Sequence, residues 1–190
     1  MSYLQRKLTS SSRCGRLYGM FKSCADIFYS YFSHYHPFLP FLDPGIPPHR
    51  YYDTSALLFW SIISVASRRM QSNPTLLTRL ARTVTDVLWR SLQAIPHTLG
   101  VIQSLILLCA WPFPTSSSTT DPTYMLTGMI MQLSIQMGLH RPRNPEDFTK
   151  FRIKLTPQDI TDRRRTWIAS NIVAQRYVDP EVLGVTYNVR

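Results

Sequence analysis

The stretch "VIQSLILLCAWPFP" (residues 101–114) decides the fold that we expect for this chain of 190 residues. Apolar side chains surround most of its circumference in a helical projection, and Gln103 and Ser104 interrupt them. A helix of this kind is normally central in a helical bundle, and this one is too short to span a bilayer. Pro112 and Pro114 cannot continue a helix. The stretch therefore predicts a buried helix from Leu99 to Ala110.

A second segment, Ser55–Met70, is also apolar nearly all round, and its serines form a side that would let another helix approach closely. Four further segments carry apolar residues at three- and four-residue spacing, which is typical of amphipathic helices. They are Leu17–Ser33, Asn73–Ala94, Asp121–Gly138 and Thr156–Gln175. No segment alternates at period two. The predicted fold is therefore all-α, an irregular bundle of about six helices, and we expect it to be an incomplete domain.

Several residues predict where these helices begin and end. Asn73 and Asp121 each precede a proline, as N-cap residues often do. Thr156 and Asp159 have the spacing of a capping box. Gly138 is expected to end its helix, because glycine readily adopts the left-handed conformation found at helix C-termini.

Two connecting segments have distinct compositions. The prolines of "HPFLPFLDPGIPP" (residues 36–48) favour extended backbone, because each one disfavours helix in the residue before it. We expect apolar side chains to hold this segment against a hydrophobic surface; they are Phe38, Leu39, Phe41 and Leu42. The loop Thr115–Thr120 contains Ser and Thr alone, and we expect it to tolerate changes in length.

The composition allows a hydrophobic core and favours an acidic partner. Hydrophobic residues make up 44% of the chain, and 21 Lys and Arg against 11 Asp and Glu give a formal charge of +10. This excess makes nucleic acid the first candidate partner, although a basic but otherwise ordinary surface is the simpler interpretation. The cysteines, Cys14, Cys24 and Cys109, are few and scattered, which favours a reducing compartment. We expect Cys109 to be a small core residue.

The first 16 residues are basic and Ser-rich, and no long apolar segment follows them. They are therefore not typical of a secretory signal. A transit peptide is one alternative, because such peptides are rich in Arg and Ser and poor in acidic residues. The simpler interpretation is a disordered basic N-terminus.

Three histidines are candidates for metal or proton chemistry. His34 and His36 could ligate a metal from an extended segment, but no neighbouring cluster in the sequence completes a site, and aromatic packing at a helix end is the simpler interpretation. His140 follows a helix-ending glycine and is expected to cap carbonyls there. As a general base it has no evident nucleophile or orienting carboxylate. No phosphate-binding, dinucleotide-binding, zinc-protease or serine-hydrolase motif is present. We therefore predict no catalytic residue and no metal site, and the cofactor-binding residues stay unknown.

Other residues allow a structural and a functional interpretation. The methionines of the fifth helix either fill the core or form an adaptable binding surface; they are Met125, Met129, Met131 and Met137. The tract Arg163–Arg165 is either a localisation or phosphate-binding tract or an exposed basic helix face. Trp167 is expected to face the core, because it is in register with Ile160 and Ala174.

Five segments, taken in order, say more than any of them alone. They read "YFSHYHPFLPFLDP" (31–44), "LLFWSIISVASRR" (57–69), "QSLILLCAWPFP" (103–114), "DPTYMLTGMIMQLSIQMGLHRP" (121–142) and "DRRRTWIASNIVAQ" (162–175). This text resembles the middle regulatory domain of fungal binuclear zinc-cluster transcription factors. Within that family it is most similar to the regulators of leucine biosynthesis. The resemblance covers residues 17–175, and the blocks "LLCAWP" and "GLHRP" are its most specific part.

The resemblance implies a non-catalytic all-α domain that controls a DNA-binding module elsewhere in the same protein. In the leucine regulators this domain responds to a metabolic intermediate, so the resemblance also implies a small-molecule effector. It implies a nuclear protein that regulates gene expression by RNA polymerase II. The implied partners are other parts of a full-length transcription factor or the transcription machinery. DNA would be bound only weakly or indirectly, and a membrane would not be a partner.

The sequence departs from the family pattern in two places. The family's six-cysteine zinc cluster is absent, so zinc is expected only in the missing DNA-binding module and not in this chain. Residues 176–190 no longer resemble the family, whose domain continues through further helices. We therefore expect a disordered N-terminus (1–16), the N-terminal part of a regulatory domain (17–175) and an unrelated tail (176–190). We interpret the chain as a fragment, and we expect apolar residues of its last helix to lack a partner.

Two functions from other classes stay open. A stand-alone basic nucleic-acid-binding protein would need its arginines on one side of the molecule; the residues concerned are Arg79, Arg82, Arg90 and Arg163–Arg165. An all-α enzyme would need polar groups that converge in a pocket.

Overall fold

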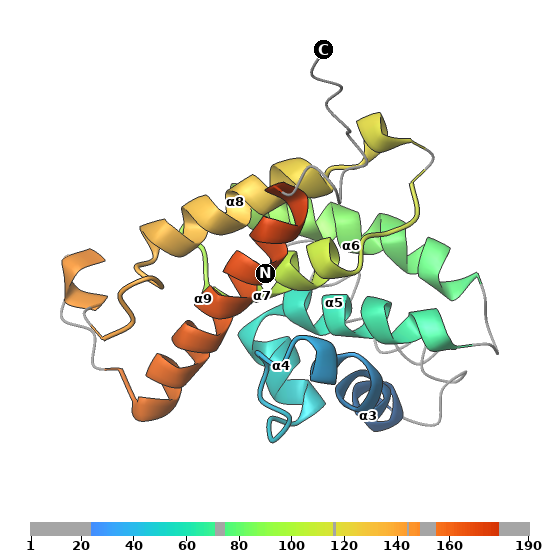
Figure 1. Cartoon of the computed structure of the whole chain (residues 1–190). Coiled ribbons are helices and arrows are strands. Elements are labelled where there is room, and N and C mark those ends of the chain that lie inside the picture. The colour runs from blue at the N-terminus through green and yellow to red at the C-terminus, as the bar shows by residue number, and fades with distance from the viewer. Residues whose placement is uncertain (1–23, 71–74, 116, 144, 149–154, 179–190) are drawn as a thin grey trace, which may run out of the picture.

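The computed structural model describes residues 24–70, 75–115, 117–143, 145–148 and 155–178. Within these ranges the chain forms helices and no strand, so the predicted all-α fold is confirmed (Figure 1). The α-helices are α3 (Cys24–His34), α4 (Pro48–Thr54), α5 (Ala56–Ala66), α6 (Leu76–Gln93), α7 (Leu99–Ala110), α8 (Thr123–Gln136) and α9 (Pro157–Val178). Short 3-10 turns lie between them: η1 (His36–Phe38), η2 (Ser67–Arg69), η3 (Ser118–Thr120) and η4 (Pro145–Phe148).

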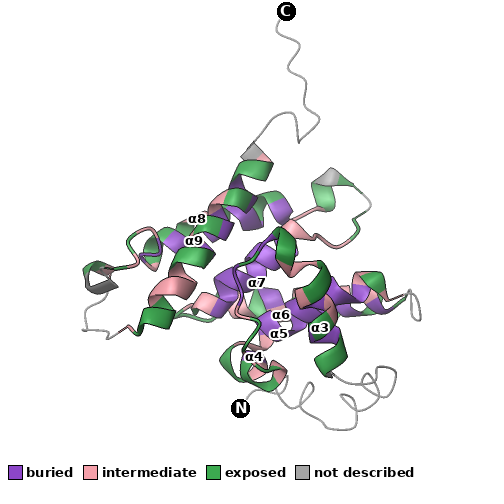
Figure 2. Ribbon diagram, turned by 60° about the horizontal axis from the view of Figure 1, so that its bottom comes forward, coloured by how far each residue is buried: buried purple, intermediate pink, exposed green. Residues whose placement is uncertain are grey.

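Helices α5 and α7 form the centre of the bundle. Every residue of the ranges 57–66 and 100–109 is buried, and the buried ribbon of Figure 2 is concentrated in these two helices. Helix α5 packs against α3, α4, α6 and α7, whereas α7 also packs against α8 and α9. The two helices that the sequence predicts to be central are therefore central, and α7 has the bounds predicted for it.

A glycine lets these two central helices pack closely, and the serines buried in α5 bond within their own helix. The Oγ of Ser61 donates to the Leu57 carbonyl at 2.9 Å, and the Oγ of Ser64 donates to the Ser61 carbonyl at 2.8 Å. Hydroxyls satisfied within their own helix can be buried without a partner from another helix. A Cβ on Gly100 would lie 2.6 Å from the Cβ of Ser55, which is closer than such atoms approach. The first turn of α7 therefore requires glycine at position 100, where it passes Ser55 at the start of α5.

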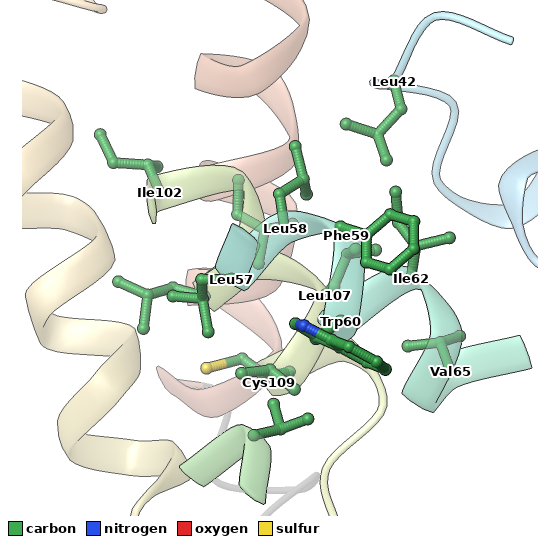
Figure 3. Packing of buried hydrophobic residues seen from close by; sticks show 14 of the residues in the cluster. Leu42, Leu57, Leu58, Phe59, Trp60, Ile62, Val65, Ile102, Leu107 and Cys109 are labelled. Atoms are coloured by element: carbon green, nitrogen blue, oxygen red, sulfur yellow. The ribbon is translucent and has the colours of Figure 1, made fainter. Parts of the chain in front are cut away.

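The side chains of α5 and α7 fill the core between the other helices (Figure 3). Trp60 is 6% exposed and packs edge-on against Phe59, with ring centroids 5.3 Å apart. Cys109 of α7 is fully buried, and this burial raises the pKa of its thiol to about 12. The thiol is therefore protonated at neutral pH and occupies space as a small apolar group, as the sequence predicts.

Helix α4 is absent from the sequence prediction, which expects extended backbone throughout residues 36–48. Pro48 instead occupies the first turn of α4, and Pro37 lies in the first turn of η1. The expectation of extended structure is wrong at both places, because proline is well tolerated where a helix has no use for its missing N–H. The predicted anchoring of this segment holds for the buried side chains of Leu39, Phe41 and Leu42. It is wrong for Phe38, which is 80% exposed.

The predicted capping box opens α9. The backbone N–H of Asp159 donates to the Thr156 hydroxyl at 3.2 Å, and the backbone N–H of Thr156 donates to the Asp159 carboxylate at 2.8 Å. Hydrogen bonds from the hydroxyl and backbone of Thr156 lower the pKa of the Asp159 carboxyl. The helix continues beyond the predicted end at Gln175 as far as Val178.

Gly138 ends the α8 region as predicted. Its φ of 68° is left-handed, its N–H donates to the Ile135 carbonyl at 2.9 Å, and the N–H of Leu139 donates to the Ser134 carbonyl at 2.9 Å. This pair of bonds is the Schellman arrangement that favours glycine. A Cβ at this position would also collide with the ring of Phe148 at 2.3 Å.

The predicted starts of two helices are only partly met. Helix α6 begins at Leu76, and the predicted cap Asn73 lies outside the described residues, as do residues 17–23 of the predicted first helix. Before α8, Pro122 occupies the N-cap position predicted for Asp121. The Asp121 carboxylate still accepts a hydrogen bond from the backbone N–H of Thr123 at 2.9 Å, and so holds the first turn.

Replacing Trp60 with alanine should destabilise the fold strongly. The substitution would leave a cavity in the core, and losses of about 3–5 kcal/mol are usual for a buried aromatic side chain. Chemical unfolding of the Trp60→Ala protein measures this loss. Trp89→Ala is the matched control, because Trp89 is 36% exposed, and it should cost clearly less. Equal unfolding midpoints for the parent and Trp60→Ala would contradict the central placement of this ring.

Shortening the loop Thr115–Thr120 to a few glycines should change the free energy of unfolding by less than about 1 kcal/mol, because the closure entropy of a loop varies slowly with its length. The hydrogen bonds of its described residues stay within the loop; Ser117 Oγ lies 2.8 Å from Thr119 Oγ1. Thermal unfolding of the shortened protein tests this expectation. A loss of several kcal/mol would show that the loop packs on the bundle.

Candidate functional site

Polar side chains gather around the C-terminal end of α7. The hydroxyl of Tyr177 donates to the Cys109 carbonyl at 2.7 Å, and the guanidinium of Arg176 donates to the Ala110 carbonyl at 3.2 Å. The guanidinium of Arg68 donates to the carbonyls of the next two residues, at 2.9 and 2.7 Å. The last carbonyls of a helix have no intrahelical partner and carry partial negative charge, so cations stabilise them. Side chains from η2 and α9 thus bind the terminus at which prolines end α7.

An apolar cleft with a basic rim lies beside this terminus. Its volume is about 430 Å³, and its walls come from the end of α3, η1, η2, the end of α7 and α9. Its lining includes Phe38, Leu39, Arg69, Trp111, Ile172 and Arg176. Tyr35, on the same wall, meets Trp111 edge-on at a centroid distance of 5.5 Å. Burial raises the pKa of the Tyr35 phenol, and the charges of Arg68 and Arg69 oppose this rise. We call this feature the α7 cleft.

The paired histidines at the end of α3 serve the fold. His36 Nε2 donates to the Leu42 carbonyl at 2.9 Å, and its ring lies 5.1 Å from that of Phe32. His34 Nδ1 donates to the Ser30 carbonyl at 2.9 Å. The part of the chain that the structure describes contains no group of three or more His, Cys, Asp or Glu side chains able to hold a metal ion. The geometry thus supports the interpretation of these histidines as helix-end packing residues.

At the end of α8 the expected capping cation is a different residue. The His140 ring packs edge-on against Phe148 at 5.0 Å and lies 6.0 Å from the Trp167 ring. The guanidinium of Arg163, from α9, donates to the Met137 carbonyl instead. The prediction for His140 is therefore wrong, because the chain turns its ring into an aromatic contact while α9 supplies the cation. Trp167 is half-buried and packs against the core, close to the prediction.

The arginines considered for nucleic-acid binding are divided between α6 and α9. Helix α6, with Arg79, Arg82 and Arg90, packs on α5, whereas α9 packs on α7 and α8. The two helices lie on opposite sides of α7 in Figure 1. Within the tract Arg163–Arg165, the first side chain is half-buried and the other two are exposed. The two helices thus pack on different neighbours, which does not favour the single basic face that a stand-alone nucleic-acid-binding protein would need.

The methionines at and near α8 differ in burial. Met129 and Met137 are half-buried and pack against the core, whereas Met125 is 50% exposed. The position of each in the helix decides its role.

One polar contact escapes sequence reasoning because its members are 115 residues apart. The side-chain amide of Gln158 donates to the Asp43 carboxylate at 3.3 Å and to the Asp162 carboxylate at 3.1 Å. Burial and the neighbouring Asp43 raise the pKa of the Asp162 carboxyl. The contact ties the start of α9 to the segment before α4.

No helix among the described residues is long and apolar enough to cross a membrane.

Comparison with known proteins places this fold in a family. The model of the fungal specific transcription factor domain matches residues 28–170, which include most of the described bundle. The chain is 31% identical over 135 residues to the putative transcription factor SEF1 of Kluyveromyces lactis and 33% identical over 135 residues to the transcriptional regulatory protein SEF1 of Candida albicans. Each of these alignments covers 70% of the chain. No solved structure matches it.

A further relative is the regulatory protein LEU3 of Saccharomyces cerevisiae, which is 28% identical over 176 residues, or 85% of the chain. The chain spans a small part of these relatives: 12% and 14% of the two SEF1 proteins and 19% of LEU3. The match of the family model, together with these relatives, agrees with the resemblance seen in the sequence. The chain belongs to the family of fungal specific transcription factor domains.

Proposed function

We propose that residues 17–175 act as a regulatory domain of a fungal transcription factor. In this role the domain carries out no catalysis and controls the expression of genes transcribed by RNA polymerase II. The observation that carries the proposal is the family match over residues 28–170, because it covers helices from every part of the described bundle. The relatives are transcriptional regulators.

The chemistry of the described residues supports a regulatory rather than a catalytic role. The centre of the fold is an apolar helix pair whose hydroxyls are satisfied within their own helices. The Cys109 thiol is buried with a raised pKa, which suits packing and not nucleophilic attack. The polar groups around the end of α7 bind backbone carbonyls.

The proposal extends to partners, cofactors and location. The domain works in the nucleus, through other parts of a longer transcription factor or the transcription machinery, and responds to a small-molecule effector. Zinc belongs to a DNA-binding module with six cysteines, which the three cysteines of this chain do not supply. The predicted domain of residues 17–175 leaves residues 1–16 and 176–190 outside it. Its end at residue 175 divides α9, because Arg176 and Tyr177 belong to this helix and bind the end of α7.

A transcription reporter tests the regulatory role. The whole chain, inserted between an unrelated DNA-binding domain and an activation domain in yeast, should change reporter output several-fold relative to a flexible linker. Trp60→Ala should abolish this change because it disrupts the core, whereas Arg82→Gln, at an exposed position of α6, should preserve it. Immunoblots control for protein amount. Output equal to that of the linker fusion, at equal abundance, would contradict a regulatory role.

The chain alone should not recognise a DNA sequence. Reading bases requires several side chains held at base edges in a groove, and the basic helices here lie on different sides of the bundle. A net charge of +10 should give weak binding that falls steeply with salt. Titration of random and promoter-derived duplexes at rising salt measures this. Tight binding of one duplex at physiological salt, retained in a chelator, would instead favour the stand-alone nucleic-acid-binding protein.

A further inference from the structure

Helix α9 carries an unpartnered apolar stripe between basic residues. Ile168 and Ile172 lie one turn apart and are 58% and 53% exposed. Arg164 lies one turn before the first isoleucine, and Arg176 lies one turn after the second. Residues four apart share a helix face, so the four side chains form one continuous ridge. We call it the α9 ridge.

The α9 ridge runs into the α7 cleft. Ile172 and Arg176 belong to both, and Phe38 also lines the cleft with 80% of its surface exposed. The floor of the cleft is apolar and includes the buried side chains of Leu39 and Val173. Exposed apolar side chains next to a hollow are typical of an interaction site. The cleft offers room for one apolar side chain of a partner that lies along the ridge.

The charges along the ridge define the partner. Neither Arg164 nor Arg176 forms an ion pair with a carboxylate among the described residues, and Arg69 adds a third cation at the cleft. A partner that covers the ridge must therefore bring negative charge to both ends of its apolar contact. Two isoleucines one turn apart are best covered by apolar side chains with the same spacing on another helix.

Other occupants fit this surface less well. In a symmetric pair of copies, α9 would lie either parallel or antiparallel to its mate, and in both cases arginine would face arginine across the contact. Nucleic acid would meet the arginines but would leave both isoleucines without an apolar contact. A small ligand in the cleft would leave Ile168 in water, because this residue does not line the cleft.

We propose that the α9 ridge and the α7 cleft together dock an acidic amphipathic helix of a partner protein segment. The partner helix places two apolar side chains over Ile168 and Ile172 and acidic side chains against Arg164 and Arg176. An apolar group at its end enters the cleft beside Trp111. This partner surface goes beyond the regulatory role proposed above.

A synthetic peptide tests the proposal on the purified whole chain. The probe is a fluorescein-labelled, Ala-rich helix with Glu, Leu, Leu and Glu four residues apart, a pattern complementary to the ridge in either direction. Binding is followed by fluorescence anisotropy at physiological salt. Two control peptides are measured in the same way. One replaces both Leu with Ala and the other replaces both Glu with Lys, and each change should weaken binding by about tenfold or more.

Variants of the chain assign the binding to the ridge. Ile172→Ser should weaken peptide binding by about tenfold, whereas Ile135→Ser, at an exposed isoleucine of α8, should leave it unchanged. The double variant Arg164→Glu with Arg165→Glu should bind the Glu peptide more weakly and the Lys peptide more tightly than the parent does. Arg82→Glu should change neither affinity. These positions are exposed, so melting temperatures should stay close to that of the parent and identify any variant that fails to fold.

Three outcomes would overturn the proposal. The first is peptide affinity that is equal for the parent and Ile172→Ser. The second is a dimer of the chain, seen by light scattering, that Ile172→Ser converts to a monomer, because the occupant would then be a second copy. The third is displacement of the peptide by a DNA duplex whose own affinity is unaffected by Ile172→Ser, because the surface would then bind phosphates. All three readouts use the isolated chain and so differ from the reporter that tests the regulatory role.

Discussion

The close contact between α5 and α7 is the constraint on which the rest of the structure depends. Both helices are buried on all sides, so neither can form without the other and without the helices around them. The start of α7 passes so near Ser55 that only glycine fits at position 100. The buried serines of α5 bond to carbonyls of their own helix, so their hydroxyls are not left unsatisfied. The outer helices are arranged by the faces that this pair leaves for them.

The end of α7 connects this core to the surface. Its terminal carbonyls would be costly to leave without partners in a partly buried position, and Arg68, Arg176 and Tyr177 provide these partners. Two of those side chains come from α9, so the last described helix is tied to the core by polar bonds as well as by packing. The same arrangement places arginines beside an apolar cleft. One structural requirement thereby creates the surface that suits an acidic partner.

The strong positive charge is not concentrated in one place. Arginines on α6 lie away from those on α9, and the side chains of Arg68 and Arg163 are used to bind the ends of other helices. The net charge therefore says little about nucleic acid in this fold. What distinguishes α9 is that cations and exposed isoleucines share one face, which fits a protein partner better than a phosphate backbone.

Periodicity alone determined the all-α class, the burial of both central helices and the bounds of α7, because a helix that is apolar all round has nowhere else to go. Local chemistry likewise determined the capping box of Thr156 and the terminus at Gly138, since both depend on residues close in the chain. Only the tertiary structure decided that Pro48 begins a helix, that Arg163 and not His140 caps α8, and that Gln158 bonds to the distant carboxylate of Asp43. It also decided that Ile172 stays exposed beside the α7 cleft. These outcomes depend on which elements meet in space, and spacing along the chain does not encode the positions of residues brought together from distant segments.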